Sequence, residues 1–367
     1  MTPLGAGVRE RVTRAWQHGV GPAATRALEV AGAGYRGVLG MREWLYARGV
    51  LKCRALGVPV VSIGNLTVGG TGKTPAVELA VRTLMERGRR PAVLSRGYGR
   101  RGGGIRVVAD GASIRLDADE GGDEPFLLAR RLPGVPVIVG PNRYASGRHA
   151  VERFGVDALV IDDGFQHRTL VKDLEIVMVR ARAPWGNGRL FPSGPLREPL
   201  TALARAHLVV VTGSGGADDA ADVVGAMRVY APDVPIMAAR HVPTECWQAA
   251  TMAYLGPDAL RGLKLFGFAG VGYPDGFRRT LTDAGALEVG FTRFADHHRY
   301  TRDDLGMLEK RAAAASAVGL VTTEKDWTRL RALPPPAVPL YVLAVRLALI
   351  SGASDWQAAF ARAIRSA

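Results

Sequence analysis

Residues 60–75 read Val-Val-Ser-Ile-Gly-Asn-Leu-Thr-Val-Gly-Gly-Thr-Gly-Lys-Thr-Pro: an apolar run, a glycine-rich turn and the triplet Gly72-Lys73-Thr74. Apolar residues at helical spacing follow, up to residue 84. Glycines let backbone N–H groups approach a polyphosphate, and the positive end of the following helix attracts its charge. Lys73 adds a positive charge, and the Thr74 hydroxyl can bind Mg²⁺. The stretch therefore predicts a phosphate loop that binds a nucleotide.

One position of this stretch departs from the usual phosphate-loop pattern. That pattern has a glycine five residues before Gly72, where this chain has Thr67. Gly69 and Gly70 can supply the conformational freedom instead. A chance Gly-Lys-Thr after a turn is the alternative, but the strand before it and the helix after it favour nucleotide binding. The residues expected at the nucleotide are Thr67, Val68, Gly69, Gly70, Thr71, Gly72, Lys73 and Thr74.

The length and composition favour a protein of two domains with sizeable cores. The chain has 367 residues, of which 47% are hydrophobic, and a formal net charge of +14 at pH 7. Such a charge favours an anionic partner: nucleic acid, an anionic membrane surface or a phosphorylated substrate. Cys53 and Cys246 have no metal-ligand spacing and are expected to be reduced thiols of a cytoplasmic protein. We find no secretory signal and no run that could span a bilayer, so we expect a soluble or peripheral protein.

The first 54 residues mix basic side chains with apolar and aromatic ones. They contain nine Lys and Arg residues against three Glu residues. A basic amphipathic helix with Trp and Leu on one side often lies in a membrane interface. A pair of helices packed on the following domain, with a solvated basic face, explains the same pattern. The residues alone leave both interpretations open.

From residue 58 onward, short β-rich runs alternate with helical stretches, which predicts an α/β fold with a largely parallel sheet. We expect a P-loop NTPase-like domain with a mostly parallel sheet and a second, smaller α/β lobe. The expected segments are a basic helical segment (1–54), the phosphate-loop domain (55–235), the smaller lobe with its linker strands (236–345) and a C-terminal helix (346–367). Predicted strands cover residues 58–63, 91–94, 105–108, 135–139, 158–161, 174–178, 207–211, 236–242, 265–269, 287–291, 319–322 and 340–345. Predicted helices cover residues 74–86, 124–131, 217–229, 277–281, 302–315 and 354–365.

Two pairs of acids stand where they could meet the nucleotide. Asp162 and Asp163 follow the apolar run 158–161, and ligands of open α/β sheets bind at the carboxyl ends of strands. One of these acids can bind Mg²⁺ together with the loop threonine, or both can simply cap the strand end. Asp123 and Glu124 precede a predicted helix, so Asp123 could be a helix N-cap or could accept a proton from a hydroxyl nucleophile. The residues leave these roles open.

Several basic and aromatic residues follow predicted strands. Arg96 and Tyr98 lie on a glycine-containing loop that could grip phosphate or sugar, or could be a solvated basic loop. Arg143 and Arg197 are further arginines at such positions. Each of these signals is weak by itself.

Asp296, His297 and His298 are consecutive residues of the second lobe. Too few Asp and His clusters accompany them for a two-metal phosphoesterase site. A histidine that reaches across a cleft to the nucleotide fits better, and a surface histidine pair is the alternative. A guanine-nucleotide enzyme is disfavoured, because residues 323–326 (Thr-Glu-Lys-Asp) lack the residue between Lys and Asp that an Asn-Lys-x-Asp motif requires.

Taken together, these motifs resemble the tetraacyldisaccharide 4′-kinase family of lipid A biosynthesis along nearly the whole chain. One motif would be weak, but all of them in this order are highly specific. The family's own phosphate loop has the same departure at Thr67. The matching segments are 64–75, 95–99, 122–125, 162–167, 190–198, 270–274, 296–300 and 323–326.

The resemblance implies transfer of the γ-phosphoryl of ATP, with Mg²⁺, to the 4′-hydroxyl of a tetraacylated glucosamine disaccharide 1-phosphate, which forms lipid IVA. It also implies peripheral attachment to the cytoplasmic face of the inner membrane, which favours membrane contact by residues 1–54. We expect an anionic membrane surface and the acylated disaccharide as partners, no nucleic acid, and a monomer.

The resemblance also implies roles for individual residues. Asp123 acts as the base on the sugar hydroxyl and His297 assists it, with Lys73 and Asp163 as further catalytic residues. Thr74 and Asp162 are the implied metal ligands. The residues expected to bind substrate are Arg96, Tyr98, Glu124, Arg143, Gln166, His167 and Arg197. A different P-loop kinase or NTPase, and a basic nucleic-acid-binding ATPase, are the competing interpretations.

Overall fold

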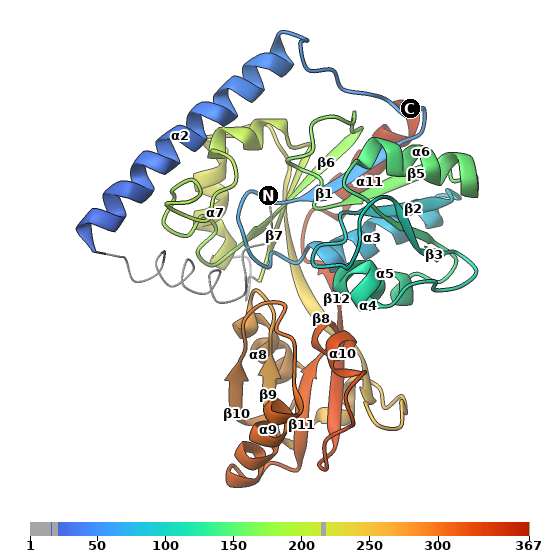
Figure 1. The fold of residues 1–367 in the computed structure, drawn as a ribbon, viewed down its shortest axis with the longest axis vertical. Coiled ribbons are helices and arrows are strands. Elements are labelled where there is room, and N and C mark those ends of the chain that lie inside the picture. The colour runs from blue at the N-terminus through green and yellow to red at the C-terminus, as the bar shows by residue number, and fades with distance from the viewer. Residues whose placement is uncertain (1–15, 17–20, 214–217, 367) are drawn as a thin grey trace.

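The computed structural model describes residues 16, 21–213 and 218–366 of the chain. Its twelve strands are β1 (Val60–Gly64), β2 (Pro91–Ser95), β3 (Arg106–Asp110), β4 (Pro136–Val139), β5 (Ala158–Asp162), β6 (Leu174–Arg180), β7 (Leu208–Thr212), β8 (Ile236–Gln248), β9 (Lys264–Ala269), β10 (Leu287–Arg293), β11 (Gly319–Thr323) and β12 (Leu340–Leu349). They form one sheet in the order β10-β9-β11-β12-β8-β7-β6-β1-β5-β2-β4-β3. Figure 1 shows that this sheet carries a large α/β unit at the top and a smaller one at the bottom.

β1, the strand that leads into the phosphate loop, lies inside the sheet of the large unit. It pairs in parallel with β5 on one side and β6 on the other, and all five of its residues are buried. Parallel strands covered on both faces consist of continuous apolar runs, which is how these strands appear in the sequence. Within the described sheet, the pairs β3–β4 and β8–β12 are antiparallel and the other pairs are parallel.

Helices cover both faces of the large unit. On one face, Leu84 of the helix after the phosphate loop packs in a core with Trp356 and Phe360 of the C-terminal helix. On the other face, Ala150 packs with Leu159 of β5. The elements of the large unit are α2 (Pro22–Ala47), α3 (Lys73–Glu86), α4 (Ala118–Gly121), α5 (Asp123–Arg131), α6 (Arg143–Phe154), the 3₁₀ helix η1 (Leu200–Arg205), α7 (Asp218–Arg228) and α11 (Ala353–Ser366).

The small unit places one helix on each face of its strands. Phe277 of α8 (Pro274–Asp283) packs with Val321 of β11, and Leu308 of α9 (Arg302–Ala314) packs with Leu320 of the same strand. Two shorter helices complete it: the 3₁₀ helix η2 (Pro257–Leu260) and α10 (Glu324–Leu330). α10 begins directly after β11, at the edge that faces the large unit (Figure 1).

Two long strands join the units. The first residues of β8 pair with β7 of the large unit, and residues 239–248 pair antiparallel with β12. The first residues of β12 pair with β11 of the small unit. The sheet therefore continues from one unit into the other. We propose residue 236, where β8 begins, as the boundary at which the second lobe starts.

The predicted α/β fold with a mostly parallel sheet is confirmed. β8 and β12 extend past their predicted ends at residues 242 and 345, and α6 and α10 are additional to the predicted helices. In the N-terminal segment, residues 22–47 form the long helix α2, and the rest of the expected helical pair falls mostly outside the described residues. Residue 217 of the helix predicted at 217–229 also lies outside them.

Candidate active site

The phosphate loop joins the end of β1 to the start of α3. Gly72 is the N-cap of α3 and has φ 81°, a left-handed conformation that favours glycine. Two hydrogen bonds fasten the loop: the Val68 N–H donates to the Pro195 carbonyl (2.8 Å), and the Thr212 hydroxyl donates to the Thr71 carbonyl (3.1 Å). The positive end of α3 therefore stands behind a fixed glycine turn, as binding of a polyphosphate requires.

Lys73, the first residue of α3, lies among polar groups at the strand ends. Its Nζ donates to Oδ1 of Asn65 at 3.2 Å and is 3.3 Å from Oδ1 of Asp163. Nη1 of Arg197 donates to both oxygens of Asp163, at 2.8 and 3.0 Å. Burial alone would raise the pKa of Asp163, but Lys73 and Arg197 hold it well below its ordinary value. Asp163 is therefore an ionised carboxylate between two cations.

Asp162 ends β5 and is only 2% exposed. Its Oδ2 accepts a hydrogen bond from the Ser95 hydroxyl at 3.0 Å, whereas its buried Oδ1 has no hydrogen-bond partner among the described residues. Burial raises the pKa of Asp162, and the charges of Glu124 and Asp163 raise it further. An unsatisfied carboxylate oxygen near the phosphate loop suits a hard cation such as Mg²⁺, which the Thr74 hydroxyl can also ligate.

Asp123 and His297 meet although they come from different units. The N-cap of α5 is Gly122, with φ 96° and no capping side chain, so the alternative that Asp123 caps this helix is wrong. Instead, Oδ2 of Asp123 lies 3.1 Å from Nδ1 of His297 and 3.3 Å from Nε of Arg329. Burial alone would raise the pKa of Asp123, but the hydrogen bond with His297 and the charge of Arg329 hold it below its ordinary value.

His297 and His298 have different surroundings. His297 adopts φ 62°, and its N–H donates to the Gly270 carbonyl at 3.1 Å, so the local backbone directs it toward the large unit. His298 stacks on Phe294 with ring centroids 4.6 Å apart, and its Nε2 lies 3.0 Å from Asp304. The alternative of a surface histidine pair therefore does not describe these residues: one histidine faces Asp123 and the other packs within its own unit.

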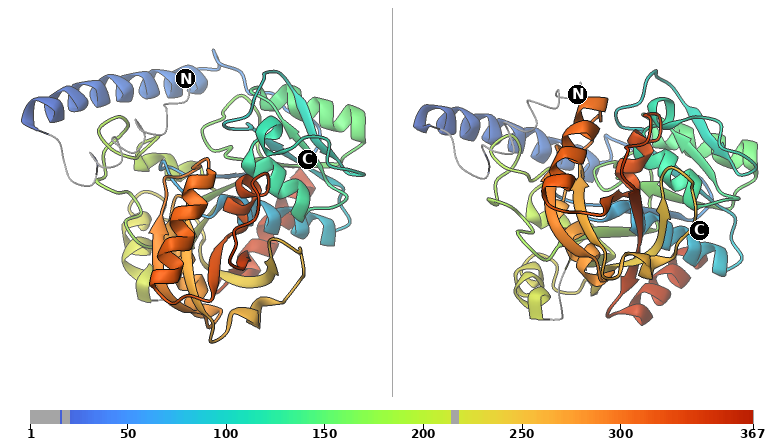
Figure 2. Two further views of the ribbon diagram at one scale, coloured as in Figure 1. Left: turned by 60° about the horizontal axis from the view of Figure 1, so that its bottom comes forward. Right: turned by 90° about the horizontal axis from the view of Figure 1, so that it is seen from below.

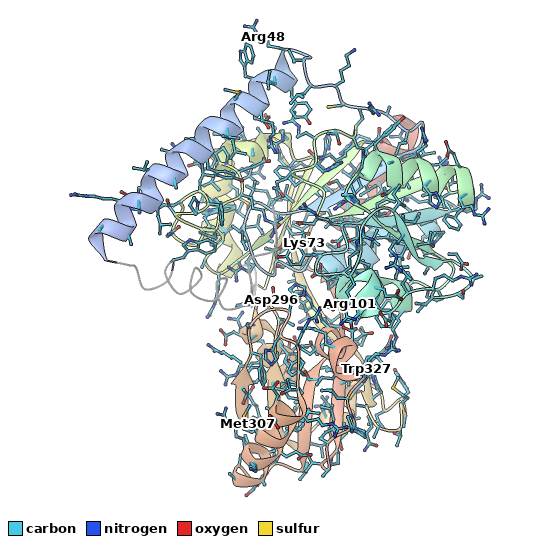
Figure 3. The ribbon with its side chains drawn as sticks, in the orientation of Figure 1. Arg48, Lys73, Arg101, Asp296, Met307 and Trp327 are labelled. Carbon is cyan, nitrogen blue, oxygen red and sulfur yellow. The ribbon has the colours of Figure 1, made fainter. Side chains whose placement is uncertain are left out.

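Two residues at this boundary escaped the sequence analysis as site residues. Nζ of Lys325 donates to Glu124 at 2.8 Å and lies 3.6 Å from Asp296, and Arg329 contacts Asp123. Both belong to α10, which starts in the Thr-Glu-Lys-Asp motif. This motif is one of the segments that resemble the family, so it could have pointed to Lys325 as a site residue. Figure 3 labels Lys73 and Asp296 on the facing edges of the two units.

The other predicted substrate-binding residues lie around these groups. Gln166 donates to the Asn65 carbonyl at 2.9 Å, so it shares the network of Lys73 and Asp163. The Tyr98 ring centroid is 6.0 Å from that of His297. Glu124 accepts the hydrogen bond from Lys325 that is described above.

Arg143 and His167 are less open than the sequence suggests. Arg143 is 3% exposed and donates to the Gly140 carbonyl at 2.6 Å, and burial lowers its pKa to about 10. Burial and the charge of Arg143 lower the pKa of His167 to about 4. Arg96 is exposed on the loop after β2, and its charge acts on both residues. Arg96, Arg143 and His167 therefore lie close enough for the two arginine charges to affect the neighbouring pKa values.

The phosphate loop also touches the small unit directly. A Cβ on Gly272 would lie 2.3 Å from the backbone N of Gly70 and 2.8 Å from its Cα. We expect Gly272→Ala to lower turnover by about 10²-fold, because the methyl group forces the two units apart and a shift of about 1 Å has that effect. Gly306→Ala, in open space on α9, is the matched control. A Gly272→Ala protein with wild-type turnover in a steady-state kinase assay would contradict this contact.

Comparisons with known proteins identify the family of this chain. The chain matches the family model described as tetraacyldisaccharide-1-P 4′-kinase over residues 24–365. A curated tetraacyldisaccharide 4′-kinase of Syntrophus aciditrophicus is 42% identical over 354 residues, which cover 93% of this chain and 94% of that protein. One of Anaeromyxobacter sp. (strain K) is 46% identical over 361 residues, which cover 96% and 95%.

A solved structure is also similar. The crystal structure of LpxK from Aquifex aeolicus in complex with ATP has a TM-score of 0.72 and 27% sequence identity. The match covers 93% of this chain and 99% of that one. The family predicted from the motifs is confirmed, and this chain belongs to the tetraacyldisaccharide-1-P 4′-kinase family.

Proposed function

We propose that this chain transfers the γ-phosphoryl group of ATP to the 4′-hydroxyl of tetraacyldisaccharide 1-phosphate and so forms lipid IVA. Family membership supports this function. The observation that carries it in the structure is the Asp123–His297 contact of 3.1 Å, next to a phosphate loop. A phosphoryl-donor site beside an ionised carboxylate is what transfer to a hydroxyl requires.

The transfer exchanges one P–O bond for another. The 4′-oxygen forms a bond to the γ-phosphorus while the bond to the β–γ bridging oxygen breaks, and ADP leaves with that oxygen. The hydroxyl proton passes to Asp123, which His297 orients. Phosphoryl transfer depends mainly on positioning and charge stabilisation, so Lys73 at the phosphates supplies a large share of the acceleration. Asn65 and Asp163 contact the Lys73 ammonium group, and Arg197 in turn holds Asp163.

Mg²⁺ is the cofactor that the phosphate loop implies besides ATP. Thr74 and the unsatisfied Oδ1 of Asp162 would hold it, in keeping with its preference for a few protein oxygens plus substrate phosphates. When bound, the ion neutralises charge on the β- and γ-phosphates. Glu124 lies close enough to Asp162 to affect its ionisation and is a further acidic group at this edge.

The acceptor lies, in this proposal, between the two units. Tyr98 and Glu124 stand beside His297 and would contact the sugar that carries the 4′-hydroxyl. Arg96, Arg143 and Arg197 supply positive charge for the phosphate groups, and Gln166 and His167 supply hydrogen-bonding groups. We propose a monomer, because Asp123 and His297 of one chain complete the pair.

Acceptor selectivity tests the proposed function against other P-loop enzymes. Purified protein with ATP and Mg²⁺ should phosphorylate the tetraacyldisaccharide 1-phosphate and leave short-chain sugars and glucosamine unphosphorylated. DNA and RNA should not stimulate ATP hydrolysis. Preference for a small sugar would support a different small-molecule kinase, and stimulation by nucleic acid would support the nucleic-acid ATPase instead.

We further propose that α2 attaches the protein to the inner membrane from the cytoplasmic side. One face of α2 is fastened to the large unit: the Tyr35 hydroxyl donates to the Arg197 carbonyl at 2.9 Å, and Arg42 pairs with buried Glu198 at 2.6 Å. The rest of the α2 surface exposes Val30, Val38, Met41 and Trp44, with Val38 66% and Trp44 53% exposed. Figure 2 shows α2 extending past one side of the molecule. No helix in the described residues has the length and apolarity to cross a bilayer.

Changing the exposed apolar residues of α2 tests the membrane proposal. We expect Val38→Ser, Met41→Ser and Trp44→Ser together to weaken binding to phosphatidylglycerol vesicles by at least about tenfold, since each buried apolar side chain contributes about 1.5–3 kcal/mol. High salt should weaken binding further by screening the basic residues.

The control for this experiment is a pair of exposed apolar residues in the small unit. Met252→Ser with Tyr254→Ser should leave vesicle sedimentation unchanged, and ATP affinity should be normal in all variants. If the α2 triple variant co-sediments like the wild type, the membrane contact lies elsewhere.

A further inference from the structure

We propose that Arg329 is a positioning residue for the acceptor side of the reaction: it holds one oxygen of Asp123 so that the other oxygen receives the proton of the acceptor hydroxyl. The inference rests on the proposed function and assigns a role to a residue outside the predicted site. It concerns the contact between α10 of the small unit and α5 of the large unit.

Both contacts to the carboxylate fall on the same atom. Nδ1 of His297 is 3.1 Å from Oδ2 of Asp123, and Nε of Arg329 is 3.3 Å from that oxygen. The hydrogen bond with His297 and the shortest ion-pair contact with Arg329 thus both fall on Oδ2 rather than on Oδ1. The buried Nε of Arg329 has no aligned hydrogen-bond acceptor among the described residues, so Asp123 Oδ2 is the acceptor it approaches. Oδ1 is therefore the oxygen left for a substrate hydroxyl.

Arg329 is itself fixed by the small unit. Its side chain is 6% exposed, its Nη2 lies 3.2 Å from Oδ1 of the fully buried Asp326, and its Nη1 donates to the His298 carbonyl at 3.0 Å. Oδ1 of Asp326 also accepts from the Gly270 N–H at 3.0 Å and the Tyr300 hydroxyl at 2.8 Å. An arginine held by so many buried partners has little freedom and can position the group it meets.

The same partners connect Arg329 with His297. Gly270, whose N–H binds Asp326, accepts the His297 N–H at its carbonyl oxygen, at 3.1 Å. The carbonyl of His298, the next residue, accepts from Arg329. The two groups that contact Asp123, His297 and Arg329, are thus held by one network. This network consists of Asp326, Gly270 and the His298 carbonyl. Arg329 and His297 both contact Asp123 across the boundary between the units.

The hydrogen bond with His297 and, after it, the charge of Arg329 lower the pKa of Asp123 against the effect of burial. The charged and titratable groups that face Asp123 are Arg329 and Lys325 of α10 and His297. Their combined effect keeps the pKa of Asp123 below its ordinary value despite burial. A low pKa makes Asp123 a weak base, but the hydroxyl proton moves late in a loose phosphoryl-transfer transition state. The ionisation and orientation of the carboxylate then affect the reaction rate more than its basicity does.

The test is steady-state kinetics of Arg329→Gln and Arg329→Lys, with Arg302→Gln, an exposed arginine at the start of α9, as the control. We expect Arg329→Gln to lower kcat about 10²-fold, the usual effect of misplacing a reacting group, with the KM for ATP unchanged. Loss of the cation raises the pKa of Asp123, so the acid limb of the pH–rate profile should move up by about one pH unit. Arg329→Lys should keep the acid limb near that of the wild type while kcat falls.

An Asp123→Asn background separates positioning from a structural effect. There, Arg329→Gln should cause no further loss, because the carboxylate that it positions is gone. A further multiplicative loss, or a normal kcat and acid limb in the Arg329→Gln single variant, would overturn the role of Arg329. A loss that follows a lower melting temperature and weaker ATP binding would also overturn it. Absence of acceptor phosphorylation by the wild-type protein would instead contradict the proposed function.

Discussion

Lys73→Ala is expected to lower turnover by about 10³-fold or more, because it removes the cation that neutralises the transferred phosphoryl group. Lys73 begins α3 directly after the glycine turn, and Asn65 and Asp163 hold its ammonium group at 3.2 and 3.3 Å. Loss of the side chain leaves Asp163 paired with Arg197 alone, so a carboxylate then faces the incoming phosphates without its lysine. The measurement is the initial rate of ATP-dependent phosphorylation of the acylated disaccharide.

The control for this variant is Lys264→Ala, an exposed lysine at the start of β9. It should have normal turnover, and both proteins should have melting temperatures close to that of the wild type. Near-normal turnover of a folded Lys73→Ala protein would refute the assignment of the phosphate loop.

The second large effect is expected at the pair that joins the units. Asp123→Ala and His297→Ala should each lower kcat by about 10²–10⁴-fold, the usual range for loss of acid–base assistance. ATP affinity should change little, because neither Asp123 nor His297 belongs to the phosphate loop. The double variant should be scarcely slower than the slower single variant, since the two act as one unit. Rapid-mix single-turnover kinetics, with nucleotide binding measured separately, distinguish these effects.

The pH–rate profile adds an independent readout for this pair. In His297→Ala, Asp123 loses a hydrogen bond that helps to lower its pKa, so the acid limb should move to higher pH. Losses that multiply in the double variant would indicate independent roles. An unchanged pH profile in His297→Ala would remove the histidine from the proton path.

Much of the large unit could be predicted because its signals are local. Buried parallel strands are continuous apolar runs, and the glycine turn before Lys73 marks both the loop and the following helix. α6 escaped prediction because its face is polar and Gly147 interrupts it. That glycine allows close packing, since a Cβ there would lie 2.5 Å from Cδ1 of Leu56. Only its N-cap, Asn142, which accepts from the Ala145 N–H, was a visible signal.

The site was predictable as a set of motifs, but its contacts were not. Asp123 and His297 are 174 residues apart, and only the meeting of two units brings them together. Spacing alone left Asp123 as a possible N-cap, and the left-handed Gly122 settles that point. Arg329 lies beyond the Thr-Glu-Lys-Asp motif, and its contact with the buried Asp326 of that motif shows only in the fold.

Identification of the phosphorylated product tests the central claim most directly. Purified protein, ATP, Mg²⁺ and tetraacyldisaccharide 1-phosphate should yield one new phosphate monoester, which phosphorus NMR and mass spectrometry assign to the 4′-oxygen, with one ADP released for each product. Lys73→Ala and Asp123→Ala proteins should give almost none. A phosphate at another position, or ATP hydrolysis without a phosphorylated lipid, would contradict the account.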